Sequence, residues 1–370
     1  MLAFRIIHAS ASVSKAKLQP KKALPRVFPA SSVSSTSSTN ASPYSSTTSI
    51  AHTPLTGVFA VNKPTGLTST TIVDYLQHVC RENRAHPFVQ RVLELDPSIR
   101  AKKRGMVKIG HGGTLDPLAR GIVVIGMGAG TKKLHKLTLS SKVYIAEGRL
   151  GFSSTTLDST GSLVSTGPTD HITKEALLQA LHAFKGEISQ TPPLYSALNM
   201  DGKRLYDYAR EGLALPREIP SRKVQIHELD LLSFPDGTTV PDPSLEKYGF
   251  RYGSTTEPNL SKLHFPIGFQ PKPITDGTGS GSYSGHVPIP PSPQGLFFHI
   301  RIRCSSGTYI RTLIADIASR MGTVGHMTDL LRVEQSGFKL GDKDVTLELK
   351  DCEDIERVDQ AIQAGSRISN

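Results

Sequence analysis

The chain has few cysteines and no long apolar run, and both shortages limit the classes of protein to which it can belong. Its 370 residues include only Cys80, Cys304 and Cys352, whose spacing fits neither a disulfide framework nor a CxxC zinc pattern. Thiols this sparse are typical of a reducing compartment such as the cytosol, nucleus or mitochondrial matrix. No segment approaches the roughly 20 apolar residues that span a bilayer. We therefore expect a soluble protein without a cysteine-based metal site.

Acidic residues are absent from the first 73 positions, and the first is Asp74. The whole chain carries a net charge of +11, and removing the six cations of residues 1–50 lowers it to +5. Such an excess of positive charge favours binding to a polyanion, either nucleic acid or an anionic membrane surface. The opening MLAFRIIHASASVSKAKL has the composition of a mitochondrial transit peptide, although a disordered basic tail is the alternative. We predict a leader over residues 1–52 and a location in the mitochondrion and in the nucleus or cytoplasm.

Several common catalytic motifs are also missing. The Gly-rich segment GMGAGTKK (126–133) ends in Lys but lacks the order of a phosphate-binding loop. No GxGxxG follows a strand and opens a helix, and neither HExxH nor GxSxG occurs. Nucleotide hydrolysis, dinucleotide binding and the corresponding protease and esterase chemistries are therefore poor fits.

Apolar periodicity predicts interspersed strands and helices from about position 54 onward. Apolar runs or alternation predict strands, and spacing near 3.6 residues predicts helices. In the last strand Phe298, Ile300, Ile302 and Cys304 form an apolar face opposite a basic face. The predicted strands are 57–64, 121–128, 142–151 and 297–304, and the predicted helices are 68–82, 174–184 and 309–322.

Two segments interrupt this pattern. Residues 83–108 are basic and aperiodic, and we predict an inserted loop there. Residues 235–295 are rich in Pro, Gly, Ser and Thr and cannot bury enough apolar surface to offset their ordering entropy. They are predicted to be a flexible insertion. The helix at 174–184 is expected to begin after the cap Thr173 and to bury Leu177, Leu178, Leu181 and Phe184.

The most unusual segment is GHGGTLDPLARG (110–121). Its glycines allow close backbone approaches, and Pro117 restricts the chain just after Asp116. A carboxylate in such a tight loop is well placed to meet a ligand. Taken alone, an Asp-Pro beside glycines is more often a turn or a helix cap.

The longer run GHGGTLDPLARGIVVIGMGAGTKKL (110–134) resembles the signature of TruB-family pseudouridine synthases, whose G-T-L-D-P-L-A run contains the catalytic Asp. The other family blocks follow in order, so the resemblance spans about 57–350. The leader and insertions resemble the eukaryotic, fungal-like branch. The blocks are VNKPTGLTS (61–69), SKVYIAEGRLG (141–151), QTPPLYSALNMDGKRLYDYAREG (190–212), RCSSGTYIRTLIADIA (303–318) and GHMTDLLRVEQSGF (325–338).

The resemblance implies one α+β catalytic domain over 53–350 with a mixed, mainly antiparallel sheet flanked by helices. Bacterial members continue into an RNA-binding PUA domain, but residues 351–370 are expected to be only a short tail. The implied activity is isomerisation of the uridine at position 55 in the tRNA T-loop, with no cofactor or metal, by a monomer. Two alternatives remain open: a tRNA-folding chaperone, and a synthase that acts mainly on mRNA or rRNA.

The resemblance also assigns roles to three residues. Asp116 would attack C1′, add to C6 of the ring, or act as a base at C2′, and the sequence does not separate these routes. Tyr144 would pack against the target base and help to remove the proton at C5. Arg311 would pair with Asp116 and aim it at the substrate.

Further residues are expected to support RNA binding. His111 would stack or hydrogen-bond within the RNA loop that opens around the flipped base. Lys63 would support the catalytic loop or the RNA backbone. Recognition of a folded RNA depends largely on shape and phosphate contacts. The candidate phosphate-binding cations are Lys132, Lys133, Arg301 and Arg303.

Overall fold

The computed structural model describes residues 57–95, 105–235, 263, 265–272 and 296–368. All of them belong to one compact unit, Thr53–Asn370, and the predicted leader at 1–52 lies outside the described residues. No helix within these ranges is both long and apolar enough to cross a membrane.

Strands and helices alternate along the described chain. The strands are β1 (Val58–Lys63), β2 (Ile109–His111), β3 (Arg120–Met127), β4 (Lys142–Leu150), β5 (Phe152–Ser154), β6 (Leu163–Thr166), β7 (Gly186–Gln190), β8 (Asn199–Met200), β9 (Lys203–Arg204), β10 (Arg222–Ser233), β11 (Leu296–Cys304), β12 (Gly325–Gln335), β13 (Phe338–Lys339) and β14 (Thr346–Glu348). The helices are α1 (Ser69–Glu82), α2 (Pro87–Leu95), α4 (Leu134–Thr138), α5 (Lys174–Ala183), α6 (Leu205–Arg210), α7 (Ile310–Arg320) and α8 (Ile355–Ile368), with 3-10 turns η1 (Gly128–Lys132) and η4 (Leu349–Glu353).

A 10-stranded mixed sheet organises the described residues. Its main order is β14-β1-β3-β12-β4-β11-β10-β7, with β2 paired to β3 and β13 paired to β12. Two pairs are parallel, β1 with β14 and β3 with β12, and the other pairs are antiparallel. The predicted α+β fold with a mixed, mainly antiparallel sheet is therefore confirmed.

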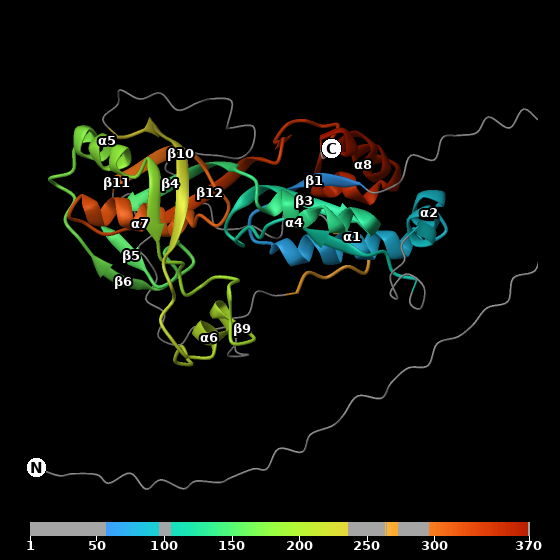
Figure 1. Cartoon of the computed structure of the whole chain (residues 1–370), viewed down its shortest axis with the longest axis horizontal. Coiled ribbons are helices and arrows are strands. Elements are labelled where there is room, and N and C mark those ends of the chain that lie inside the picture. The colour runs from blue at the N-terminus through green and yellow to red at the C-terminus, as the bar shows by residue number, and fades with distance from the viewer. Residues whose placement is uncertain (1–56, 96–104, 236–262, 264, 273–295, 369–370) are drawn as a thin grey trace, which may run out of the picture. The chain divides into compact units, whose positions relative to one another are not determined.

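Helices gather at both ends of this sheet. Figure 1 shows α1, α2 and α8 near β1 and β3, whereas α5 and α7 lie near β4, β10, β11 and β12. Residues 191–221, which contain β8, β9 and α6, project from the sheet as an arm. The arm has a small core of its own around Met200, Leu205 and Tyr208.

Cross-strand register divides the side chains of the central strands between two faces. Tyr144 of β4 lies opposite Ile302 and Arg332, so these three side chains share the face that also carries α7. Along β3, Val123 and Ile125 belong to the same core as α1 and α7. We call this the front face, and the opposite face, which includes Ile145 and Leu331, the back face.

Local sequence explains the elements that the pattern predicted. The Thr68 side chain caps α1 by accepting from the Thr71 amide, and Thr173 caps α5 in the same way through the Ala176 amide. All eight residues of β3 are buried, as its continuous apolar run indicates. One expectation is wrong within α5, because Leu178 is 46% exposed.

Three segments differ from their predictions. Residues 83–108 are not simply a loop, because α2 forms there and buries Phe88. In the 235–295 insertion the described residues include Phe269, which packs edge-on against Tyr75 of α1, while most of the insertion lies outside the described residues. The predicted C-terminal tail is largely helical, because α8 forms there and packs an apolar face against β1. The local sequence alone did not indicate this face.

Candidate active site

Asp116 lies in the loop 112–119, which connects β2 to β3. Hydrogen bonds from β1 and α1 hold this loop in place. Lys63, at the end of β1, donates to the Pro117 carbonyl at 3.3 Å and to the Leu67 carbonyl at 2.7 Å. The Ser69 hydroxyl donates to the Leu115 carbonyl and accepts from the Leu115 amide at 2.8 Å. The backbone on both sides of Asp116 is therefore fixed, while its side chain stays 31% exposed.

Arg311 connects this loop to two other segments. Its Nε donates to Asp116 Oδ2 at 2.8 Å, its Nη1 to the Thr156 carbonyl at 2.7 Å and its Nη2 to the Tyr195 carbonyl at 2.8 Å. Tyr195 belongs to the arm, so the guanidinium links α7, the Asp116 loop and the arm. The expected ion pair is present, and the side chain of Arg311 is buried rather than exposed.

A second carboxylate lies near Arg311. Asp158 Oδ2 lies 3.7 Å from Arg311 Nε, and the Asp158 carboxylate also accepts from the amide and hydroxyl of Thr160. Burial alone would lower the pKa of Arg311, but Asp116 and Asp158 outweigh it, so the pKa is raised. The guanidinium thus stays charged and fixed in direction.

Tyr144 is buried on the front face beside this pair. Burial raises the pKa of its hydroxyl, Arg332 opposes that rise, and Asp116 is close enough to add to it. The structure therefore brings Asp116, Tyr144 and Arg311 into one site, as the resemblance implied. Their catalytic roles stay predictions.

Arg332 is the residue that the sequence reasoning missed. It is 1% exposed, its Nε donates to the Ile122 carbonyl at 2.6 Å, and its Nη2 donates to the Gly113 carbonyl at 3.3 Å. Its positive charge adds to the lowering of the Lys63 pKa, which burial mainly causes, and opposes the rise that burial causes in the pKa of Tyr144. The register of β12 against β4 places it opposite Tyr144, and that pairing cannot be read from the chain alone.

The two remaining residues of the loop region differ in their availability to RNA. His111 is partly exposed at the end of β2, and burial together with Arg332 lowers its pKa, which favours the neutral ring. Lys63 is 0% exposed, and burial lowers its pKa to about 7. Its assignment to substrate binding is wrong, because its ammonium contacts backbone carbonyls inside the protein. Support of the catalytic loop is the part of the prediction that fits.

Two of the predicted phosphate-binding cations are paired with carboxylates. Arg303 lies on the back face, where it pairs with Glu228 at 3.0 Å and approaches Glu334 at 3.7 Å. Arg301 shares Glu228 at 2.7 Å. These two arginines form ion pairs on the back face, and their contact with phosphates stays a prediction. Lys132, in η1, is exposed, and Lys133 follows it with partial exposure.

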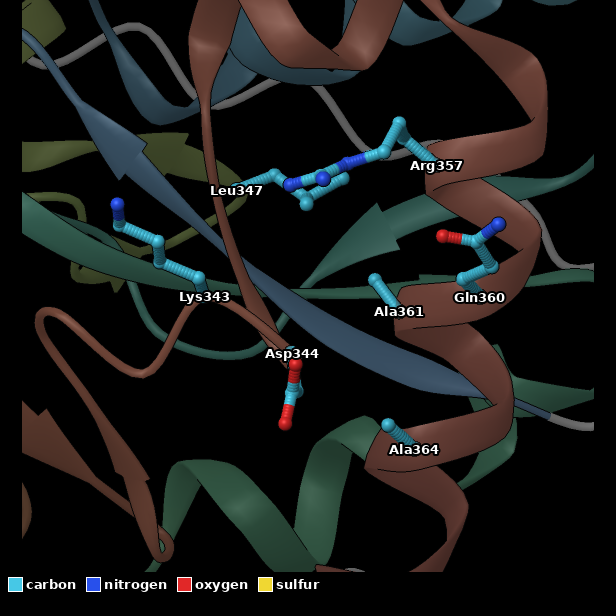
Figure 2. A pocket seen from close by; sticks show the side chains of 7 residues that line it. All are labelled: Lys343, Asp344, Leu347, Arg357, Gln360, Ala361 and Ala364. Atoms are coloured by element: carbon cyan, nitrogen blue, oxygen red, sulfur yellow. The ribbon is translucent and has the colours of Figure 1, made fainter.

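One hollow among the described residues contains none of these side chains. It has a volume of about 160 Å³ and lies between α8 and the edge strand β14 (Figure 2). Lys343, Asp344 and Arg357 line it together with small apolar groups, so it mixes both signs of charge. Within the described ranges, no three or more His, Cys, Asp or Glu side chains lie together in a way that could hold a metal ion.

Comparison with known proteins places this site in a family. Residues 101–243 match the model described as TruB family pseudouridylate synthase (N terminal domain). The chain is 35% identical to tRNA pseudouridine synthase 4 of Saccharomyces cerevisiae over 77% of this chain and 78% of that protein. It belongs to the TruB family.

Other TruB-family relatives agree. The chain is 33% identical to tRNA pseudouridine synthase 4 of Schizosaccharomyces pombe, with coverage of 78% of this chain and 80% of that protein. It is 30% identical to pseudouridylate synthase TRUB1 of Mus musculus, with coverage of 82% and 70%. These matches cover a larger share of the chain than the family model does.

Proposed function

We propose that this TruB-family protein is a tRNA pseudouridine synthase that isomerises the uridine at position 55 of the T-loop. The observation that supports it most is the assembly of Asp116, Arg311 and Tyr144 from three distant segments into one partly open site. The relatives named tRNA pseudouridine synthase support tRNA as the substrate class.

The reaction needs only groups that such a site can supply. The N1–C1′ bond of uridine breaks, the uracil turns, and C5 bonds to C1′, while the proton lost from C5 is balanced by one gained at N1. There is no net oxidation or reduction. The protein must hold the detached base and place a carboxylate at the sugar. Asp116 supplies the carboxylate at C1′, at C6 or at C2′, and these routes stay open.

The substrate base has to leave its stack before it can reach Asp116. Base extrusion costs roughly a few kcal/mol, which contacts with the surrounding RNA must offset. Asp116 is 31% exposed, whereas the side chain of Arg311 behind it is 4% exposed. An everted nucleotide would therefore meet the carboxylate first, with the guanidinium fixing it from the protein side.

The direct test uses purified protein and an unmodified tRNA transcript. We expect pseudouridine at position 55 and at no other uridine of the transcript, detected by chemical mapping of each position. A transcript with cytidine at that position is the matched control. Absence of pseudouridine from the T-loop would overturn the proposal.

Two alternatives are outcomes of related tests. An RNA chaperone would refold a misfolded tRNA equally well with Asp116→Ala, whereas a synthase loses all product formation. A synthase acting mainly on mRNA or rRNA would leave tRNA position 55 modified in cells that lack it. The predicted locations, mitochondrion and nucleus or cytoplasm, are tested by imaging the full chain and a chain lacking residues 1–52.

A further inference from the structure

The end of β12 contains a buried amide that touches the catalytic loop. Gln335 is 0% exposed, and its Nε2 donates both to the Gly112 carbonyl and, at 3.3 Å, to the Leu137 carbonyl of α4. One side chain thus ties the start of the Asp116 loop to the helix behind it.

The loop depends on such bonds because its first residues have no side chains. Gly113 has φ +105°, a conformation that L side chains rarely adopt. A Cβ on Gly112 would lie 3.3 Å from the Leu134 side chain, so a larger residue there would require Leu134 to shift. Without side chains to anchor it, the direction of the loop is set by the donors that reach its carbonyls.

Donors act at both ends of the loop, and the bond from Gln335 is the one that the site described above does not include. Lys63 and Ser69 hold the segment that follows and precedes Asp116. Arg332 reaches the Gly113 carbonyl at 3.3 Å, and Gln335 reaches Gly112. We propose that Gln335 is a positioning residue for the pseudouridine-forming reaction, acting through the Gly112 carbonyl on the orientation of Asp116.

The amide oxygen of Gln335 has no hydrogen-bond partner among the described residues, which argues against a role in fold stability alone. Gln335 Oε1 is buried and has no hydrogen-bond partner within the described structure. A buried polar atom left unpaired costs about 1–3 kcal/mol, whereas an apolar side chain of the same size avoids that cost. Methionine at this position would fill the space as well, so the amide is not needed for packing. Its distinctive contribution is the bond to the loop.

The neighbouring residue provides a matched control. Ser336 also donates to the Leu137 carbonyl, at 2.9 Å, and it contacts Ser140, but no hydrogen bond joins it to the described residues of the loop. Its φ of +54° means that glycine fits there without strain. Ser336→Gly therefore removes a bond to α4 and leaves the bond to Gly112 intact.

The experiment compares Gln335→Met, Ser336→Gly and the unchanged chain in single-turnover reactions at saturating unmodified tRNA. Misplacement of reacting groups by about 1 Å can cost about 100-fold in rate, and we expect a loss of roughly 10- to 100-fold for Gln335→Met. Its tRNA dissociation constant and melting temperature should match those of the unchanged chain. Ser336→Gly should keep the full rate.

The outcomes separate this inference from the proposed function on which it rests. An active unchanged chain with an equally active Gln335→Met overturns only the role of Gln335. The same holds if the rate falls only in parallel with melting temperature, or if Ser336→Gly loses as much. An unchanged chain that forms no pseudouridine in any RNA overturns the proposed function and this inference together.

Discussion

Arg311 Nε lies 2.8 Å from Asp116 Oδ2, although 195 positions separate the two residues. The same guanidinium donates to carbonyls of two other segments, so no other side chain could replace it without leaving acceptors unpaired. The position of the carboxylate is thereby coupled to the arm and to the loop that carries Asp158.

Replacing Arg311 with lysine tests this coupling. Lysine keeps the positive charge but lacks the planar set of donors that reaches three acceptors at once. Removing one preorganised donor from an active site costs roughly 100-fold or more in turnover, and we expect a loss of that order. Single-turnover formation of pseudouridine measures it. Arg320→Lys, an exposed position on the same helix, is the control, and equal rates for both variants would contradict the account.

Tyr144→Phe separates the ring from the hydroxyl. The ring would still pack against the base, so the affinity for tRNA should stay unchanged, while loss of a proton-transferring hydroxyl lowers the rate by about 100-fold. Binding and single-turnover assays on the same preparation distinguish the two effects. Tyr75→Phe is the control, because Tyr75 bonds to Glu353 outside the site. A variant that binds RNA poorly but reacts at the full rate would show that the hydroxyl serves recognition instead.

Lys63 should make stability depend on pH. Burial lowers its pKa from 10.5 to about 7, so between these values the unfolded chain binds more protons than the folded chain. The free energy of unfolding therefore gains a contribution as pH rises from 7 toward 10.5, of up to about 1.4 kcal/mol per pH unit. In Lys63→Met this contribution disappears.

Urea denaturation of both proteins at several pH values measures the Lys63 contribution. The unchanged chain should show the steeper rise in unfolding free energy above pH 7, and the difference in slope should vanish below pH 7. Parallel curves across the whole range would show that Lys63 keeps an ordinary pKa despite its burial.

The back face contains a buried polar network whose loss should lower stability but not catalysis. Glu147 bonds to His299 at 2.7 Å and to Thr328 at 2.6 Å, and His299 bonds to Ser233 at 2.6 Å. Glu147→Ala leaves buried partners unsatisfied, which costs about 3 kcal/mol. We expect a lower free energy of unfolding by denaturation, with unchanged turnover per folded molecule. Glu187→Ala, in an exposed ion pair, is the control and should change little.

Local patterns predicted much of the fold because most elements carry their own signal. The alternation in β11 and the helical spacing in α7 reappear as buried faces, including Ile302 and Ile314 at 0% exposure. The helices α2 and α8 were missed because their apolar faces become recognisable only when the partner surfaces are known. Leu178 followed the helical spacing but lies at the margin of the buried stripe, where nothing covers it completely.

The candidate site also shows that local sequence patterns do not reveal long-range contacts. The loop around Asp116 and its pairing with Arg311 were available from the motif resemblance. Arg332 was not, because its importance arises from strand register, which places it opposite Tyr144. The pattern around Arg303 showed a basic face without showing that Glu228 and Glu334 lie on the same face. Long-range pairing, not local composition, decided each of these cases.

The central claim is that the Asp116 carboxylate carries the reaction. Asp116→Asn keeps the size of the side chain and its bond to Arg311 Nε through the amide oxygen, but it removes the charge that could attack carbon or accept a proton. The decisive measurement is pseudouridine formation in the T-loop by this variant under single-turnover conditions, with tRNA binding measured alongside. The account predicts intact binding and no product. Product formed at a rate near that of the unchanged chain would contradict it.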